Sequence, residues 1–314
     1  MKVKFWGMRG SIPTPISPAE IEDKIRRALR GATGVDLSSE QAVERYIQRL
    51  PDEMRHTIGG NTACVEVRAG DQWLILDAGS GLRLLGYGLM NTEFALGGGA
   101  ADFLISHTHW DHIHGLPFFT PAFIAGNRLT FHSPHTHLEA AFIGQQDQIY
   151  FPVPLSYLSA DIQFNRIPAG TWTQIGHVRV YPLKMTHPGE CYGYRIEHEG
   201  KCLVYATDAE YKQLDPESTK IYVNFFRDAD LLIFDAQYSF NDALDRRDWG
   251  HSSPVMGAEM AYRAGVRRLA LFHYDPTSSD QTVYAGHRQA EAWLAKRGSS
   301  CRVIIANEGL EIEW

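Results

Sequence analysis

The feature that most constrains this chain is the segment 107–112, HTHWDH, which holds three histidines and one aspartate directly after an apolar stretch. The preceding residues 102–106 are typical of a short strand, so the cluster begins where a strand opens into a loop. Imidazole and carboxylate groups are the natural ligands of a borderline divalent ion such as zinc. A polar surface loop is the plain alternative, but burying these groups without a metal would leave donors and acceptors unpaired.

Four ligands in one loop cannot fill the coordination shells of two metal ions, so further ligands must come from elsewhere in the chain. His187, Asp208 and His273 stand in the same kind of position as the cluster, each just past a predicted strand. Taken singly, each is more often a capping or hydrogen-bonded polar residue. Taken together with the segment 107–112, they predict a metal site at the ends of several strands.

Length and composition limit the class of protein. The chain has 314 residues with 44% hydrophobic and 21% charged residues, which indicates a soluble globular protein of one or two domains. Its formal net charge of −7 disfavours a protein that holds long nucleic acid. No apolar run predicts a membrane span, no signal peptide is visible, and four scattered cysteines favour reduced thiols. A cytoplasmic protein with no membrane contact is therefore expected.

Strand patterns cluster in each half of the chain, and helix patterns lie between them. This arrangement favours an α/β protein in which two sheets face each other with helices outside. Residues 17–54 differ, because Ser17 and Ser38 each precede a glutamate or glutamine by three positions, as N-caps do in a capping box. Apolar stripes such as Ile21, Ile25 and Leu29 complete the prediction of two amphipathic helices there.

The motif HTHWDH, followed by His187, Asp208 and His273, resembles the metallo-β-lactamase-fold hydrolases. FWGMRGSIP, GGNTACVEV and LDAGSG are similar to motifs of the branch that includes tRNase Z and small phosphodiesterases. The resemblance implies an αββα sandwich of two mixed sheets. It places the chain, 1–314, in a single domain with a helical insertion at about 17–54. Members of this family are often dimers, so a homodimer is an expectation.

The resemblance also implies a ligand set for two divalent ions, of which zinc is the default and manganese is compatible. One ion would be held by His107, His109 and His187. The other would be held by Asp111, His112 and His273, with Asp208 bridging the two. A hydroxide between the metals would attack the substrate, and Asp111 would help to hold and deprotonate it.

Residues around this set are expected to assist it. The similar branch carries a G-H-S/T motif like Gly250-His251-Ser252, and there the histidine assists departure of the leaving oxygen. Asp235 could orient His251, and the resemblance suggests that Asp77 supports the metal-binding histidines. Gly60 and Asn61 are expected to line a phosphate pocket, because backbone can approach a ligand closely where side chains are absent.

The function expected from these residues is hydrolysis of a small phosphodiester, such as a cyclic nucleotide, by a dinuclear metal-dependent enzyme. A carboxylic ester, thioester or lactone hydrolase with the same ligand set stays open, as does a tRNase Z-like ribonuclease. A non-catalytic nucleotide-binding or scaffolding protein is the remaining alternative. The complete ligand set argues against it.

Overall fold

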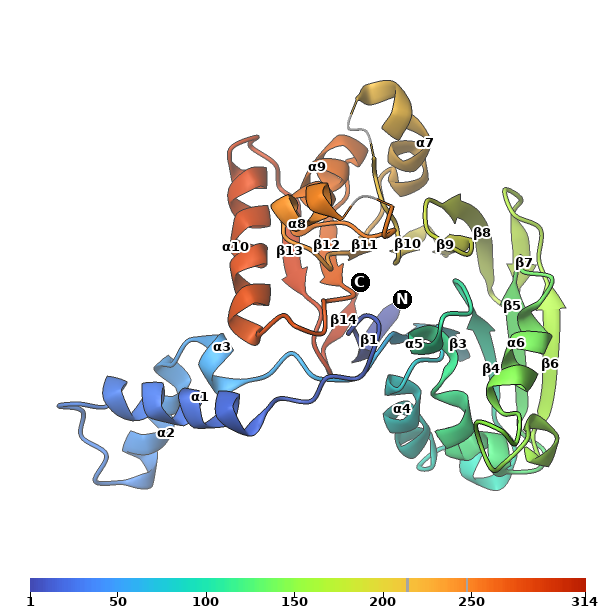
Figure 1. The fold of residues 1–314 in the computed structure, drawn as a ribbon, viewed down its shortest axis with the longest axis horizontal. Helices are drawn as coiled ribbons and strands as arrows, with labels where there is room; N and C mark the ends of the chain where they lie inside the picture. Colours follow the sequence, from blue (N-terminus) through green and yellow to red (C-terminus); the bar gives the residue numbers. More distant parts are fainter. Residues whose placement is uncertain (213–214, 247) are drawn as a thin grey trace.

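The structure of this chain is a computed structural model that describes residues 1–212, 215–246 and 248–314. Within these residues, two seven-stranded sheets pack against each other and helices cover their outer faces (Figure 1). Both sheets mix parallel and antiparallel neighbours. The predicted αββα sandwich is therefore confirmed.

The first sheet has the order β14-β1-β2-β3-β4-β5-β6. Its strands are β1 (Lys2–Gly7), β2 (Cys64–Ala69), β3 (Gln72–Leu76), β4 (Ala100–Leu104), β5 (Arg128–Ser133), β6 (Asp161–Arg166) and β14 (Glu311–Glu313). Strands β3 to β6 are parallel to one another, whereas β1 is antiparallel to both of its neighbours. Residues that follow β3 and β4 therefore meet at one edge of the sheet.

The second sheet has the order β13-β12-β11-β10-β9-β8-β7. Its strands are β7 (Thr173–Ile175), β8 (Val178–Met185), β9 (Cys191–His198), β10 (Lys201–Ala206), β11 (Leu231–Asp235), β12 (Arg268–Phe272) and β13 (Arg302–Ile305). Strands β10 to β13 are parallel. Every residue of β11 is buried, as expected for a parallel strand covered on both faces.

The core lies in layers on either side of the first sheet. Between the sheets, Phe5 of β1 contacts Phe272 of β12 with ring centroids 6.1 Å apart, and Tyr205 of β10 contacts the same ring. On the outer face, Phe103 stacks on Phe131 and both belong to a second apolar cluster. Burial of these rings contributes to the favourable free energy that holds the layers together.

The outer helices of the first sheet are α4 (Gly81–Leu89), α5 (Trp110–Ile113) and α6 (Leu138–Gln145), with the 3₁₀ turns η1 (Glu93–Leu96), η2 (Leu116–Phe118), η3 (Thr120–Phe123) and η4 (Leu155–Tyr157). The second sheet is accompanied by α7 (Pro216–Phe226), α8 (Phe240–Asp245), α9 (Pro254–Ala264) and α10 (Asp280–Ala295) (Figure 1). None of the helices in the described part of the chain combines the length and apolar character needed to cross a bilayer.

Three helices lie between β1 and β2, where two were expected: α1 (Pro18–Gly31), α2 (Glu40–Arg49) and the short α3 (Asp52–Arg55). They project away from the two sheets (Figure 1). The capping box of Ser17 and Glu20 is confirmed. The predicted cap at Ser38 is wrong by one residue, because the Ser39 side chain accepts from Ala42 N and α2 begins at Glu40.

The apolar stripe of α1 faces solvent, since Ile21, Ile25 and Leu29 are 46%, 54% and 67% exposed. Its other side is fastened to the sandwich by Lys24. The Lys24 Nζ donates to Asp280 Oδ2 at 2.5 Å and to two backbone carbonyls, those of Glu53 and His56. This charged cluster at the start of α10 is one contact that holds the helices, and Arg288 Nη1 of α10 also lies 3.7 Å from Glu53 Oε1 of α3.

Candidate metal centre

Three imidazoles from two loops converge on one point. His107 and His109 come from the loop after β4, and His187 follows β8. His107 Nε2 lies 2.9 Å from His109 Nδ1, and His187 Nε2 lies 3.2 Å from the same atom. His107 is fully buried, while His109 is exposed and lies at the mouth of the site.

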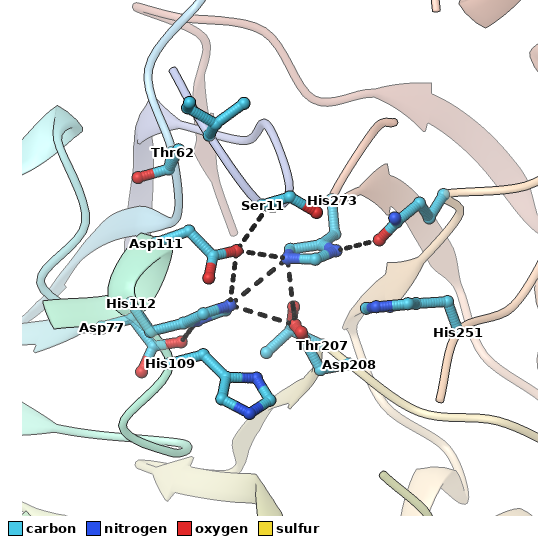
Figure 2. A network of polar contacts seen from close by, with 12 residues as sticks. Ser11, Thr62, Asp77, His109, Asp111, His112, Thr207, Asp208, His251 and His273 are labelled. Carbon is cyan, nitrogen blue, oxygen red and sulfur yellow. Dashed lines mark hydrogen bonds and ion pairs between the residues drawn. The ribbon is translucent and has the colours of Figure 1, made fainter. Parts of the chain in front are cut away.

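A second group of four side chains lies beside the first. Asp111 and His112 belong to α5, Asp208 follows β10 and His273 follows β12. Asp111 Oδ2 lies 3.2 Å from both His112 Nε2 and His273 Nε2. These groups are all buried, and Figure 2 shows their nitrogen and oxygen atoms turned toward one another.

The carboxylate of Asp208 links the two groups. Its Oδ1 lies 3.3 Å from His112 Nε2 and 3.2 Å from His273 Nε2. Its Oδ2 lies 3.6 Å from His107 Nε2 and 3.8 Å from His187 Nε2. One carboxylate therefore presents an oxygen to each group, although Asp208 is far from the 107–112 segment in sequence.

Hydrogen bonds on the outer ring nitrogens fix which nitrogen carries the proton. His112 Nδ1 lies 2.7 Å from Asp77 Oδ2, and His187 Nδ1 lies 2.9 Å from the carbonyl of Gly250. His273 Nδ1 lies 2.9 Å from Gln237 Oε1. These oxygens can only accept, so each ring donates from Nδ1, and in its neutral form the ring then presents the lone pair of Nε2 to the site.

This donor set fits divalent metal ions. Ring nitrogens of His107, His109 and His187 lie within 4.8 Å of one another, and those of His112 and His273 face two carboxylates. Crowded lone pairs and buried anions repel one another unless a cation lies among them. Five imidazole nitrogens with two carboxylates is a combination typical of zinc and of related first-row metals.

The electrostatics of the cluster point the same way. Burial opposes the charged form of His112, but Asp208, Asp111 and Asp77 outweigh it and raise the pKa of His112 well above its usual value. Burial likewise opposes ionisation of Asp208, yet the neighbouring imidazoles hold its pKa well below the usual range. The acidic groups of the site thus attract positive charge.

His251 lies beside both groups of side chains. Its Nδ1 is 2.8 Å from Asp235 Oδ2, and its ring stacks on that of His273 with centroids 5.1 Å apart. Asp235 is fully buried at the end of β11. Burial disfavours the imidazolium, but Asp235 outweighs it and raises the pKa of His251 to about 9.

Comparison with known families decides what the chain is. The sequence profile described as "Beta-lactamase superfamily domain" matches residues 72–274, which include all seven side chains of the two groups. The chain belongs to the beta-lactamase superfamily. It is a metallo-β-lactamase-fold hydrolase, as the sequence motifs predicted.

Solved structures support the metallo-β-lactamase fold over the full chain. Zn²⁺-bound PqqB from Methylobacterium extorquens aligns with a TM-score of 0.65 at 15% identity, covering 100% of both chains. YhfI from Bacillus subtilis aligns with a TM-score of 0.63 at 19% identity, and the short form of human tRNase Z aligns with a TM-score of 0.62 at 16% identity. Both alignments cover 100% of this chain and 99% of the other. At these identities the likeness concerns the fold.

Among curated relatives, a ribonuclease Z from Kineococcus radiotolerans is 28% identical over 42% of this chain. That match spans only 35% of the relative's own length. A ribonuclease BN from Proteus mirabilis is 23% identical over 58% of this chain and 75% of the relative.

Asp77 lies beneath the site of this superfamily member, at the end of β3. It is fully buried and accepts hydrogen bonds from the backbone N and the hydroxyl of Ser106, from His112 Nδ1 and from Tyr205 Oη. Its backbone has a φ of 57°, which is uncommon for a residue with a side chain. Asp77 therefore joins both sheets under the histidine loop.

The donors of Gly60 and Asn61 are already used within the protein. Both backbone N–H groups and the Asn61 amide donate to Glu308 Oε1 at 2.8–2.9 Å. A Cβ at Gly60 would lie 2.5 Å from the carbonyl of Thr14, so glycine is needed for that packing. A phosphate contact of these residues stays a prediction.

The structure adds residues that the sequence did not single out. Ser11 donates its backbone N–H to Asp111 Oδ2 at 2.7 Å, and a Cβ at Gly10 would lie 2.6 Å from the His273 ring. Gln237 and Gly250 hold His273 and His187. Their only sequence signal is proximity to Asp235, His251 and the GMRGSIP motif, because the contacts themselves depend on the tertiary fold.

Proposed function

We propose that this hydrolase cleaves small phosphodiesters, with cyclic nucleotides as the first substrates to test. The observation that carries the proposal is the Asp208 carboxylate shared between two histidine groups, with His251 directly beside them. Sites with two divalent ions suit displacement at phosphorus, because the attacking and leaving oxygens both develop charge.

Seven residues would hold two metal ions: His107, His109 and His187 on one side, Asp111, His112 and His273 on the other, and Asp208 between them. Metals bound there supply Lewis-acid chemistry, since they acidify water and neutralise charge on phosphoryl oxygens. Zinc is the default for such a histidine-rich set, and manganese is compatible with its carboxylates.

Two side chains of the protein would then transfer protons, one from the attacking water and one to the leaving group. Asp111, oriented by the Ser11 backbone N–H, is placed to accept a proton from the attacking water. His251 donates a proton to the departing oxygen from Nε2, because its Nδ1 is held by Asp235. General acid catalysis of this kind contributes about 10²–10⁴ in rate.

A tRNase Z-like ribonuclease is the second candidate, and the curated relatives named ribonuclease Z and ribonuclease BN favour it. The net charge of −7 favours the small diester, because grip on long RNA depends on neutralising phosphates. A diphosphatase from the PhnP family also shares the fold, at a TM-score of 0.58. An ester, thioester or lactone hydrolase would use the same ligand set. The substrate panel described next distinguishes it from a phosphodiesterase.

The test is hydrolysis of bis-(p-nitrophenyl) phosphate by the metal-loaded chain and by the chelator-treated chain. Turnover that disappears with chelator and returns with zinc or manganese supports the proposal. A panel of cyclic nucleotides, a precursor tRNA, a lactone and a thioester then identifies the substrate class. Hydrolysis of the lactone or thioester alone would overturn the phosphodiester assignment, and cleavage of the precursor tRNA alone would replace the small diester by RNA.

A further inference from the structure

A cavity of about 590 Å³ is lined in part by residues of the histidine loop. Its volume is within the range of small-molecule sites, which is roughly 300–1,000 Å³. Its lining includes Thr108, Trp110 and His114, from the histidine loop and just after it, together with Phe118 of η2 and Tyr150. Nothing in the catalytic scheme above uses this cavity.

The cavity begins within one residue of the metal-binding groups. Thr108 and Trp110 alternate with His107, His109 and Asp111 along the chain, and neighbouring Cα atoms are about 3.8 Å apart. His109 and Trp110 are both exposed, so the mouth of the site and the rim of the cavity adjoin.

The lining favours a flat, uncharged group. None of the residues that line this cavity is a lysine, arginine, aspartate or glutamate. Trp110 is 77% exposed, Tyr150 76% and Phe118 53%, so three aromatic rings offer uncovered surface. Exposed aromatic faces bind planar rings by stacking, which contributes substantially to affinity.

We propose that the cavity binds a planar aromatic substituent of the phosphodiester, and that Trp110 is its principal stacking surface. The proposal rests on the phosphodiesterase function above and specifies its substrate: a diester that carries an aromatic ring, either a nucleobase or another aryl group. A long RNA fits less well, because its backbone phosphates would find no cationic side chain among these lining residues.

Gly144 of α6 offers a way to fill the cavity without removing any contact. It lines the cavity, and a Cβ built there meets no atom within 4 Å. Gly144→Phe adds a ring at the lining of the cavity, and its Cβ meets no neighbouring atom. Trp110→Ala removes the stacking surface instead. Ala292→Phe, at an exposed position of α10, is the matched control for adding a ring to a helix surface.

The experiment measures binding of diphenyl phosphinate and dimethyl phosphinate, whose P–C bonds resist hydrolysis, to the metal-loaded chain by calorimetry. The wild type should bind the diphenyl compound at least about tenfold more tightly. Gly144→Phe and Trp110→Ala should each reduce this preference to about threefold or less, while Ala292→Phe keeps it. Thymidine 5′-methyl phosphate distinguishes the two sources of the ring, because tight binding that Gly144→Phe abolishes identifies a nucleobase.

Turnover of bis-(p-nitrophenyl) phosphate in the same samples separates this inference from the proposed function. Metal-dependent turnover with a ligand preference that neither variant changes would overturn the cavity assignment alone. A preference that the variants abolish, without metal-dependent turnover by the wild type, would instead refute the phosphodiesterase function. If Gly144→Phe converts a dimer to a monomer in light scattering and leaves the preference intact, the cavity is an interface between copies and the proposal fails.

Discussion

His251 donates a hydrogen bond from Nδ1 to the fully buried carboxylate of Asp235, across 2.8 Å. The same Asp235 carboxylate accepts from the backbone N–H groups of Gln237 and Ala209, so its position is fixed from several sides. A rigid acceptor holds the imidazole in one orientation and tautomer. The pair therefore explains how a histidine outside the two ligand groups could act on a substrate bound between them.

The first prediction concerns this histidine. His251→Ala should lower kcat by about 10²–10⁴ on phosphodiesters with alkyl leaving groups, because the departing alkoxide then lacks a proton donor. A nitrophenolate leaves readily without protonation, so kcat on nitrophenyl esters should fall much less. The metal content, measured by elemental analysis, should stay at the wild-type value. His177→Ala is the control, since that ring is 61% exposed. Equal losses on both substrates would refute the assignment.

The second prediction uses the close contact between Gly10 and His273. A methyl group at position 10 would lie 2.6 Å from the imidazole, so Gly10→Ala must displace the ring and break its bond to Gln237. We expect affinity for the metal ion held by Asp111, His112 and His273 to fall about 10–100-fold. Such a loss is typical when a hydrogen bond that orients a metal-binding side chain is removed. Competition with a chelating dye measures this affinity.

Gly98→Ala is the matched control, because the nearest atom to its added Cβ is 3.6 Å away. Its metal affinity should equal that of the wild type. Unchanged affinity in Gly10→Ala, together with an unchanged thermal midpoint, would show that His273 is not a ligand.

The third prediction concerns stability. Asp77→Ala leaves the hydrogen-bond donors of Ser106, His112 and Tyr205 without their buried acceptor. Loss of such a buried anion typically costs about 3–5 kcal/mol of unfolding free energy. Urea denaturation of the metal-free chain measures it. Asp77→Asn keeps one acceptor oxygen, so its unfolding free energy should lie between those of the wild type and Asp77→Ala. A loss below about 1 kcal/mol in Asp77→Ala would mean that the network does not hold the loop.

The sequence identified which residues form the site better than it identified the hydrogen bonds between them. Asp208 and His273 could be found because each follows a buried parallel strand, and such strands end at one edge of a sheet. The hydrogen bonds from Tyr205 to Asp77 and from His187 to Gly250 join residues 128 and 63 positions apart. No local pattern marks such pairs, since only the packing of the two sheets brings them together.

Local signals were informative for helix starts and weak for short elements. Ser17 and Glu20 fix the start of α1 because their hydrogen bonds are reciprocal. Two adjacent serines left the start of α2 uncertain by one residue, and only the hydrogen bond from Ala42 N chose Ser39. Strands β7 and β14 have three residues each, too few for a period of two to show.

The central claim is that seven side chains hold two metal ions, with Asp208 shared between them. Elemental analysis of the purified wild type and of Asp208→Ala tests it most directly. We predict about two divalent ions per wild-type chain and, in the variant, loss of tight binding at both positions, because each loses a carboxylate oxygen. A fully active wild type without bound metal, or a variant that still holds two ions tightly, would contradict the account.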